Sequence, residues 1–297
     1  MMYDLGPLLI RTQAWPASWT ASANRWLRTC GESEQGEQSE QSEQSTDGAP
    51  VVTVSFAGLG VAPEHEATAT TIEELLRLQR RGPSQWLLTS AGSFTATLDE
   101  HTRHLAIRAR SEHDDPALAL GNALRGLVAT TLPNASDGLM LHACAGIHEG
   151  AGVVVAGVST AGKTTLALDL EHTTYLGDDV AIVTNTSSAP TLVPSPFFGA
   201  AGVRGADVRA PLAAIGILTD KVTTPGARSS YQRVSRTRGA FELLRHVARF
   251  TDDRELSARL FHLAGDLAER VPVVLVRRSL IDRGDDVMRA IVREARC

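Results

Sequence analysis

Short apolar runs separated by polar and glycine-containing turns dominate the second half of the chain. Runs of about four to eight apolar residues are typical of buried strands. The strands predicted in this way are Met140–Cys144, Val153–Ala156, Thr173–Leu176, Val180–Val183, Ala213–Leu218 and Pro272–Val276. Apolar residues at helical spacing predict helices at Thr164–Leu170, from Leu256 to Val271 and at Val287–Ala295. Because strands alternate with helices, we expect residues 139–297 to form one α/β domain.

Residues 1–115 predict a separate, small α+β module. Phe94–Leu98 and His104–Arg108 alternate between apolar and polar residues on either side of a turn, which indicates a hairpin. Thr71–Glu74 forms a capping box, which predicts a helix that continues to about Gln79. Residues 116–138 are expected to connect the module to the α/β domain as a helix that ends before Pro133.

A low-complexity segment interrupts the N-terminal module at residues 31–48. It repeats Glu-Gln-Ser and contains no apolar residue, so it cannot offset its own ordering entropy. We therefore expect a disordered acidic insertion. Its neighbours, Leu5–Ile10 and Val51–Phe56, are strand-like, which favours a tolerated loop between two strands of one sheet over an acidic protein-binding tail.

Composition excludes several classes of protein. The net charge of -5 is local, because residues 31–48 carry six acidic residues and no basic one. The rest of the chain has no basic and aromatic stripe, which argues against a nucleic-acid partner. No apolar run approaches the roughly 20 residues of a membrane span, and the start lacks a secretory signal, so we expect a cytoplasmic protein without a membrane partner. Three widely spaced cysteines indicate neither a disulfide framework nor a thiolate metal site.

The strongest chemical signal is the pattern Gly-x-x-x-x-Gly-Lys-Thr at residues 157–164, a Walker A or P-loop sequence. Its two glycines allow the backbone N–H groups to turn inward around a phosphate. Lys163 supplies positive charge near the terminal phosphates, and the Thr164 hydroxyl can bind Mg²⁺. A strand-like run before the loop and an apolar helix after it favour nucleotide binding over a purely structural turn. The residues expected to contact the nucleotide are Gly157, Ser159, Thr160, Ala161, Gly162, Lys163, Thr164 and Thr165.

Two further features have both a chemical and a structural interpretation. Asp178 and Asp179 follow the strand-like Thr173–Leu176, where one carboxylate can act as a general base and the other as a metal ligand. A Gly-Asp-Asp turn between strands explains them equally well. His142 stands in an apolar strand-like run, where a lone histidine is more often a core residue than a catalytic one.

Taken together, Leu141–Ala145, the turn up to Gly152, the loop from Gly157 to Thr165 and Leu176–Asp179 resemble the catalytic domain of HPr kinase/phosphorylase. The valine-proline strand at Arg270–Leu275 is similar to the end of that domain, so the resemblance spans residues 120–297. It implies an ATP- and Mg²⁺-dependent kinase that phosphorylates a serine hydroxyl, on a P-loop core like that of phosphoenolpyruvate carboxykinase. It also implies assembly into a homo-oligomer.

The resemblance assigns roles by position. Lys163 and Thr164 would hold phosphate and Mg²⁺, Asp178 would activate the acceptor hydroxyl, Asp179 would face the metal, and His142 would lie near the phosphates.

The chain departs from the family in two places. The segment Phe197–Gly205 lacks the glutamate of the family signature, and the basic proline-containing loop that serves the phosphorylase reaction is not found. We therefore do not expect HPr to be the substrate. Relatives with this shortened pattern include lasso peptide precursor kinases, which indicates a serine of a peptide or protein as acceptor.

Three alternatives stay open at this point. The acceptor can be a small-molecule hydroxyl, because the same base and metal would serve it. The protein can be a nucleotide-binding regulator without transfer chemistry. It can also be an ordinary P-loop ATPase in which Asp220, at the end of the strand-like Ala213–Leu218, supplies the second metal carboxylate.

Overall fold

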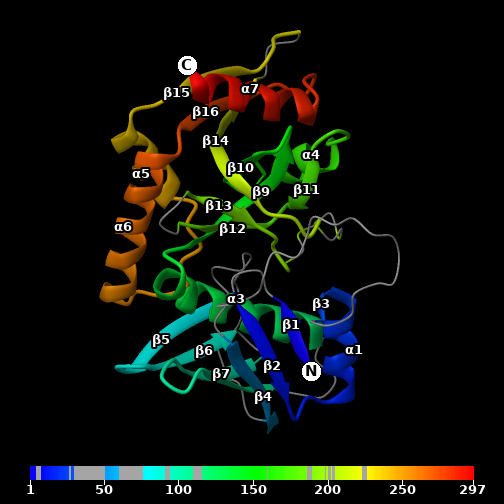
Figure 1. The fold of residues 1–297 in the computed structure, drawn as a ribbon, viewed down its shortest axis with the longest axis vertical. Coiled ribbons are helices and arrows are strands. Elements are labelled where there is room, and N and C mark those ends of the chain that lie inside the picture. Colours follow the sequence, from blue (N-terminus) through cyan, green and yellow to red (C-terminus); the bar gives the residue numbers. More distant parts are fainter. Residues whose placement is uncertain are drawn as a thin grey trace. The chain divides into compact units, whose positions relative to one another are not determined.

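The structure is a computed structural model of the 297-residue chain. It describes residues 1–4, 8–26, 28–29, 51–59, 76–90, 94–109, 116–158, 160–185, 189–197, 199, 202, 205–222 and 226–297. The acidic insertion expected at 31–48, the capping box at Thr71–Glu74 and Ser159 lie outside these described residues. The chain divides into two compact units, Met1–Leu127 and Val128–Cys297, and the fold is mixed α/β with one sheet in each unit (Figure 1).

The N-terminal unit is built on one mixed sheet. Its strand order is β3-β1-β2-β4-β8-β7-β6-β5. The strands are β1 (Met2–Asp4), β2 (Leu9–Gln13), β3 (Arg28–Thr29), β4 (Val51–Leu59), β5 (Leu76–Gly82), β6 (Gln85–Ser90), β7 (Phe94–Asp99) and β8 (His104–Ala109). The helix α1 (Ala17–Trp26) follows β2. Because β2 and β4 pair in parallel, the segments before and after the acidic insertion do belong to one sheet.

Two sequence predictions for this unit meet different outcomes. The hairpin is confirmed, because β7 and β8 pair antiparallel with Leu98 opposite Leu105. The helix that was expected to reach Gln79 is wrong over its described part, since Leu76–Gly82 forms strand β5. Leu76 and Leu78 are both buried and face the same side, as the two-residue period of a strand requires. Pairing with β6 therefore outweighs the helical spacing of the apolar residues.

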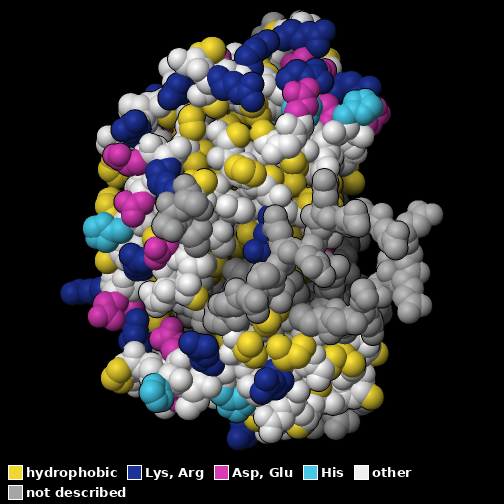
Figure 2. Space-filling model, in the orientation of Figure 1, with side chains coloured by type: hydrophobic (Ala, Val, Ile, Leu, Met, Phe, Trp, Pro, Cys, Tyr) yellow, Lys and Arg dark blue, Asp and Glu magenta, His cyan; other side chains and the backbone are white. Residues whose placement is uncertain are grey.

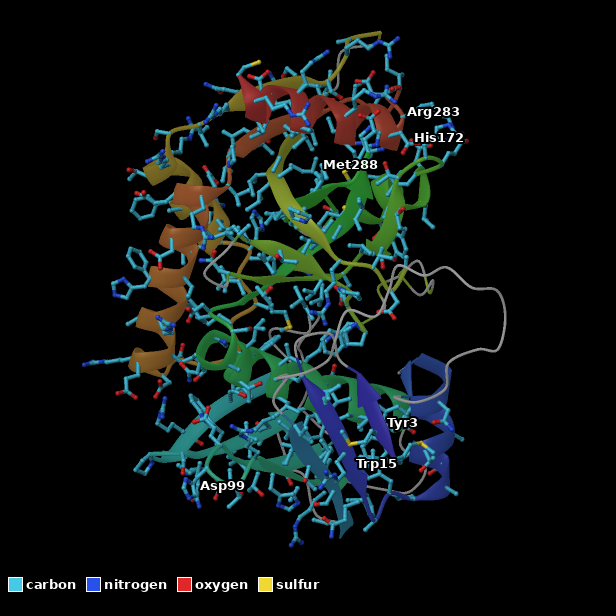
Figure 3. The ribbon with its side chains drawn as sticks, viewed as in Figure 1. Tyr3, Trp15, Asp99, His172, Arg283 and Met288 are labelled. Atoms are coloured by element: carbon cyan, nitrogen blue, oxygen red, sulfur yellow. The ribbon has the colours of Figure 1, made fainter. Side chains whose placement is uncertain are left out.

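Aromatic side chains close one end of the N-terminal core. Tyr3 and Trp15, both labelled in Figure 3, stack with ring centroids 5.9 Å apart. The Trp15 indole Nε1 donates a hydrogen bond to the carbonyl of Val54, and the Tyr3 hydroxyl donates to Asn24 Oδ1. Each ring thus buries its apolar body while its polar atom is satisfied.

The helix α3 (Pro116–Ala135) contains the boundary between the two units. The prediction that it ends before Pro133 is wrong, because the helix continues for one more partial turn. Proline removes only its own N–H donor, and the Leu132 carbonyl still accepts hydrogen bonds from the N–H groups of Ser136 and Gly138. Leu132 is fully buried, so packing holds this last turn in place.

The C-terminal unit contains a second mixed sheet. The strands pair in the order β10-β9-β12-β13-β14-β16-β15, and β10 pairs additionally with β14. They are β9 (Leu139–His148), β10 (Ala151–Gly157), β11 (Thr174–Gly177), β12 (Val180–Thr184), β13 (Thr191–Val193), β14 (Ala210–Lys221), β15 (Ser230–Arg233) and β16 (Val273–Arg278). Neighbouring strands β10, β14 and β16 run parallel, so their carboxyl ends share one edge. All six strands predicted for this half are confirmed, although several are longer than their apolar runs.

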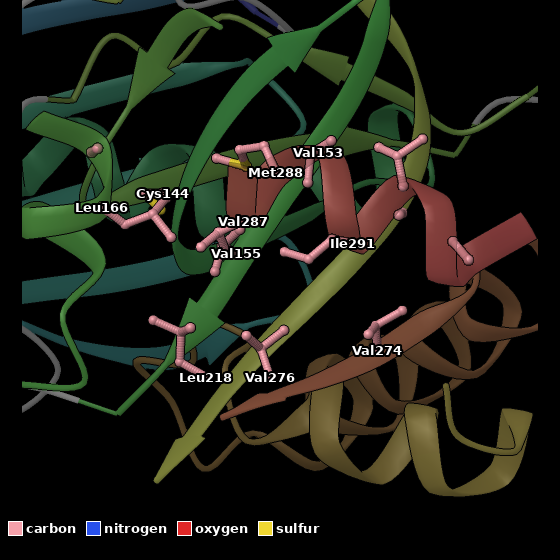
Figure 4. Packing of buried hydrophobic residues seen from close by; sticks show 14 of the residues in the cluster. Cys144, Val153, Val155, Leu166, Leu218, Val274, Val276, Val287, Met288 and Ile291 are labelled. Atoms are coloured by element: carbon pink, nitrogen blue, oxygen red, sulfur yellow. The ribbon is translucent and has the colours of Figure 1, made fainter. Parts of the chain in front are cut away.

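Among the described residues, the helices that follow α3 in this unit are α4 (Lys163–Leu168), α5 (Arg236–Leu244), α6 (Arg254–Arg270) and α7 (Gly284–Arg296). The helix α7 packs across β10, β14 and β16 through Val287, Met288 and Ile291, which meet strand residues such as Val153 and Val274 (Figure 4). Each fully buried side chain of this kind contributes roughly 1.5–3 kcal/mol. On the outer side, Lys and Arg side chains gather over β15 and α7 (Figure 2). No helix among the described residues is long and apolar enough to span a membrane.

Candidate functional site

Strand β9 brings three of the predicted segments together. Its residue Ala143 pairs with Ala156, at the end of β10, and its residue His142 pairs with Val180, at the start of β12. Gly157 and Asp179 are the next residues along those two neighbouring strands. Because Ala156 near the end of β10 lies opposite Ala143 and Val180 at the start of β12 lies opposite His142, the loop after β10 and the turn before β12 lie on either side of the same part of β9. This part of the sheet is the candidate site.

The first part of the site is the loop of residues 157–164, hereafter the glycine loop. A Cβ on Gly157 would lie 2.9 Å from Leu218 Cβ on β14, which is too close, so only glycine fits at the start of the loop. Gly162 has φ of 103°, in the left-handed region that favours glycine. Both glycines of the sequence pattern therefore have a geometric reason. Ser159 of this loop lies outside the described residues.

Lys163 lies inside the glycine loop rather than in solvent. Its side chain is only 7% exposed, and Nζ donates hydrogen bonds to the carbonyl oxygens of Gly157 at 2.7 Å and Val158 at 3.2 Å. The ammonium group thus closes the loop on itself. The next two residues, Thr164 and Thr165, are half-buried and exposed respectively, while Thr160 is exposed in the loop with a positive φ of 68°.

The second part of the site is the pair of carboxylates in the β11–β12 turn. Asp178 is 2% exposed, and its Oδ1 accepts hydrogen bonds from the Tyr175 hydroxyl at 2.9 Å and from the Gly199 N–H at 3.0 Å. A Cβ on Gly199 would lie 2.7 Å from Asp178 Oδ2, so the segment can approach the carboxylate only with glycine there. Burial, followed by the hydrogen bond to Asp178, raises the pKa of Tyr175 and keeps it a donor at neutral pH.

Asp179 has a different environment from its neighbour. Its backbone carbonyl accepts a hydrogen bond from the Ala143 N–H, while its side chain is 21% exposed. The Oδ1 atom lies 3.4 Å from His142 Nδ1, and the His142 side chain is 30% exposed. One aspartate is therefore buried and the other is partly exposed, beside an imidazole that is also partly exposed. This arrangement makes Asp179 the more accessible carboxylate.

His246 is a site residue that sequence reasoning did not identify. Its carbonyl accepts a hydrogen bond from the His142 N–H at 2.8 Å, which joins the segment after α5 to β9. Burial lowers the pKa of His246 to about 4, and the positive charges of Lys163, Arg245 and His142 lower it further in the same direction. The ring is therefore neutral at physiological pH. A single histidine after a helix carries no local signal, so only the fold reveals it.

Two further buried residues lie near the glycine loop. Cys144 lies on β9 opposite Val155 of β10, and burial raises the pKa of its thiol to about 12, against the influence of Lys163 and Arg278. The thiol therefore stays protonated and is not a nucleophile. Arg278 was not identified from the sequence either, and it comes from the end of β16 to donate a hydrogen bond to the Gly162 carbonyl.

The oxygen atoms available for a cation are few. Among the described residues, no group of three or more His, Cys, Asp or Glu side chains is arranged to hold a metal ion. Mg²⁺ commonly takes only one or two protein oxygens and completes its shell with water and substrate phosphates. The Thr164 hydroxyl and the Asp179 carboxylate fit that mode of binding, but they do not form a metal site by themselves.

The pairing along β9 places Asp178, Asp179 and His142 beside the start of the loop that contains Lys163, and the chemical roles assigned to these residues stay predictions. Asp220, the carboxylate of the alternative ATPase reading, is exposed two residues after Leu218, which pairs with Gly157. It therefore lies at the same edge of the sheet, on the next strand. Between β13 and β14, Asp207 and Arg209 are exposed.

Comparison with known proteins gives little more. No model of a protein family matches this sequence, and no curated protein matches it. Among solved structures, the HPr(Ser) kinase/phosphatase from Coxiella burnetii is similar at 14% sequence identity with a TM-score of 0.30, over 53% of this chain and 90% of that chain. A similarity of this size assigns neither a family nor an activity to the chain.

Proposed function

We propose that the unit Val128–Cys297 binds ATP with Mg²⁺ and transfers the terminal phosphoryl group to a hydroxyl. The observation that supports this most directly is the pairing along β9, which brings the start of the glycine loop and the turn with two carboxylates to either side of His142. A structural turn would explain either the loop or the carboxylates alone. It gives no reason for both to meet.

The glycine loop has the properties that a polyphosphate needs. The Lys163 ammonium is held by two backbone carbonyls inside the loop, so its position is fixed before any ligand binds. Fixed positive charge in a partly buried position interacts with phosphate more strongly than a mobile lysine at the surface. In this proposal the ammonium contacts the terminal phosphates, together with backbone N–H groups of the loop.

Thr164 and Asp179 are the residues proposed to hold Mg²⁺. The metal, when bound, would neutralise part of the phosphate charge and orient the transferred group. Asp179 suits this role because its carboxylate is accessible, and His142 lies against it. His142 would then fix the orientation of the Asp179 carboxylate and line the phosphate side of the site.

Asp178 is proposed as the general base. The acceptor oxygen forms a bond to the γ-phosphorus while the bond from that phosphorus to the β,γ-bridging oxygen breaks, and ADP leaves. The proton of the acceptor hydroxyl passes to Asp178. Asp178 Oδ1 accepts hydrogen bonds from the Tyr175 hydroxyl and the Gly199 N–H. Tyr175 and Gly199 hold the carboxylate in place for this transfer.

We propose a serine of a peptide or protein as the acceptor, as in precursor peptide kinases. This choice follows from the resemblance of the glycine loop and of the Asp178-Asp179 pair to HPr kinase/phosphorylase and its relatives. It does not follow from a recognised peptide groove. A small-molecule hydroxyl is the competing acceptor, and a nucleotide-binding regulator without transfer is the competing function.

The test is a transfer assay with γ-labelled ATP and Mg²⁺. The full chain is incubated with serine-containing peptides encoded by neighbouring genes, with the same peptides carrying alanine, and with a panel of small alcohols and sugars. We expect label on the serine peptides only, and none with Asp178→Asn, although that variant still binds ATP. Label on small molecules alone would show that the acceptor is a small-molecule hydroxyl and not a peptide serine. ATP binding without label on any acceptor or release by water would leave the regulator as the function.

A further inference from the structure

Arg278 is the last residue of β16. It lies at the edge of the sheet where the glycine loop begins. On parallel strands, Leu218 of β14 pairs with Gly157 of β10, and Lys221 of β14 pairs with Arg278 of β16. The carboxyl ends of parallel strands in an open α/β sheet are where ligands most often bind. The position of Arg278 on its strand is therefore equivalent to that of the first loop residues on theirs.

The guanidinium group of Arg278 is buried without a compensating carboxylate. The residue is 3% exposed, Nη1 donates a 2.9 Å hydrogen bond to the Gly162 carbonyl, and Nε has no hydrogen-bond partner. No carboxylate of the described residues lies within ion-pair distance of it, and Asp169 and Asp282 act on it only from farther away. Burial accordingly lowers the pKa of Arg278 below its ordinary value.

Such a group is unfavourable unless something compensates it. A buried cation loses its hydration, and a backbone carbonyl replaces only part of that loss. A buried N–H without a partner adds a further penalty. Since the remaining donors of a guanidinium lie in a fixed plane that matches phosphate oxygens, a phosphate is the anion that this environment suits best.

The contact with Gly162 explains how Arg278 would be brought to a phosphate. The same carbonyl also accepts the N–H of Leu166, so two donors fix the Gly162–Lys163 peptide. Lys163 donates hydrogen bonds to the carbonyls of Gly157 and Val158 at the start of the glycine loop. Arg278 donates to the carbonyl of Gly162, the residue before Lys163. Two cations are thus attached to the two ends of one loop, and both lie close enough to Cys144 to affect the pKa of its thiol.

We propose that Arg278 is a second phosphate-binding residue of the site, which contacts a phosphate oxygen of the bound nucleotide while Nη1 stays on Gly162. The inference rests on the proposed function and deepens it, because it assigns to the polyphosphate a contact from β16. It also implies that the ligand-free protein carries a penalty that binding removes. A residue that only clamps the loop would have the opposite effect on stability.

The experiment uses Arg278→Met, which keeps the length of the side chain and removes its charge. The matched control is Arg277→Met, on the same strand but exposed. Thermal midpoints are measured without ligand, and the affinities for Mg²⁺-free pyrophosphate and for ADP with Mg²⁺ are measured by calorimetry. We expect the Arg278→Met midpoint to equal or exceed that of the wild type, while both affinities fall about tenfold or more. Arg277→Met should change neither quantity.

The outcomes separate this inference from the proposed function. If Arg278→Met is less stable but binds both ligands like the wild type, Arg278 is only a clamp and the inference is overturned, while nucleotide binding stands. If it is less stable and also binds weakly, Arg278→Lys decides: regained pyrophosphate affinity supports the contact, and affinity as low as that of the methionine variant overturns it. If the wild type binds neither ligand, the proposed function fails as well.

Discussion

His142 Nδ1 lies 3.4 Å from Asp179 Oδ1, and this contact follows directly from the pairing of β9 with β12. The histidine lies on β9 and the aspartate lies in the turn between β11 and β12. Neither residue is deeply buried. Their proximity is therefore not needed to complete a core, and in the proposed function it orients a carboxylate toward the metal.

Asp179→Asn should reduce transfer without unfolding the protein. The amide keeps the size of the side chain but is a weaker ligand for Mg²⁺, so we expect phosphoryl transfer to fall about 100-fold and the Mg²⁺ concentration for half-maximal rate to rise. A Mg²⁺ titration of the transfer rate measures both effects. Asp252→Asn, at an exposed position, is the control. An unchanged Mg²⁺ dependence in Asp179→Asn would remove this residue from the metal site.

Gly199→Ala should displace the Asp178 carboxylate while the glycine loop stays intact. The added Cβ would lie 2.7 Å from Oδ2, and the Gly199 N–H would no longer reach Oδ1. We expect transfer to fall at least about tenfold while the Kd for ATP changes by less than about threefold, since the base is disturbed but the phosphate contacts are not. Steady-state rates and calorimetry on the same samples measure this separation.

The control for that variant is Gly265→Ala in α6, where an added Cβ meets no atom within 4 Å. Alanine is the better helix former, so the free energy of unfolding should rise by about 0.5–1 kcal/mol with unchanged transfer. Equal losses of ATP affinity and of transfer in Gly199→Ala would mean that this segment supports the whole site and not Asp178 in particular.

Much of the C-terminal unit is predictable from sequence because its signals are local. An apolar strand, a glycine loop and an apolar helix follow one another without interruption from Val153 to Leu168, and each restricts the backbone independently. The prediction for Leu76–Gln79 failed because four residues satisfy both a helical and an alternating period. There, the partner strand β6 decides the structure, and it had not been predicted.

The parts of the site that sequence reasoning missed depend on pairing across the fold. His246 reaches the site because its carbonyl accepts the His142 N–H, a contact between residues about 100 positions apart for which the sequence gives no signal. For Arg278 the sequence does contain a signal, because two arginines follow the predicted strand Pro272–Val276 at its carboxyl end. If that strand is placed parallel to the one before the glycine loop, the arginines fall at the ligand-binding edge.

The buried His246 should make stability depend on pH. Its pKa is about 4 in the folded protein and about 6.5 when unfolded, so the unfolded chain binds the proton first as pH falls. The free energy of unfolding should therefore be constant above about pH 7 and decrease between about pH 6.5 and 4, by up to roughly 3 kcal/mol. Urea unfolding at intervals of half a pH unit measures this slope.

Replacement of the His246 imidazole tests whether this residue causes the pH dependence of the free energy of unfolding. His246→Asn should flatten the pH dependence between about pH 4.5 and 6.5, whereas His262→Asn, which changes an exposed histidine, should leave it as in the wild type. If His246→Asn retains the full slope, another group carries the titration and the neutral state of His246 is not what stabilises the fold.

Asp285 should be one of the most important single carboxylates for stability. Its Oδ2 accepts the N–H groups of Glu171 and His172, and its Oδ1 accepts the Thr173 hydroxyl at 2.6 Å. Burial alone would raise the pKa of Asp285, but these hydrogen bonds outweigh burial and lower it. The ion pair between Arg283 and Glu171 joins the same two segments, and Figure 3 shows Arg283 beside His172.

Asp285→Ala should lower the free energy of unfolding by about 3 kcal/mol, because three donors lose their acceptor in a buried position. Its neighbour provides a matched control: Asp286 is exposed and pairs with Arg289, so Asp286→Ala should change the free energy by less than about 1 kcal/mol. Chemical denaturation at pH 7 compares them. Similar small losses for both variants would show that the Asp285 network adds little to stability.

Binding of nucleotide phosphates by the glycine loop can be measured in a single titration. ATP with Mg²⁺ is titrated by calorimetry into the wild-type chain and into Lys163→Ala, with circular dichroism to verify that both are folded. We expect saturable binding of about one ATP per chain by the wild type and at least about tenfold weaker binding by the variant. No binding to the wild type, or equal affinity in Lys163→Ala, would contradict it.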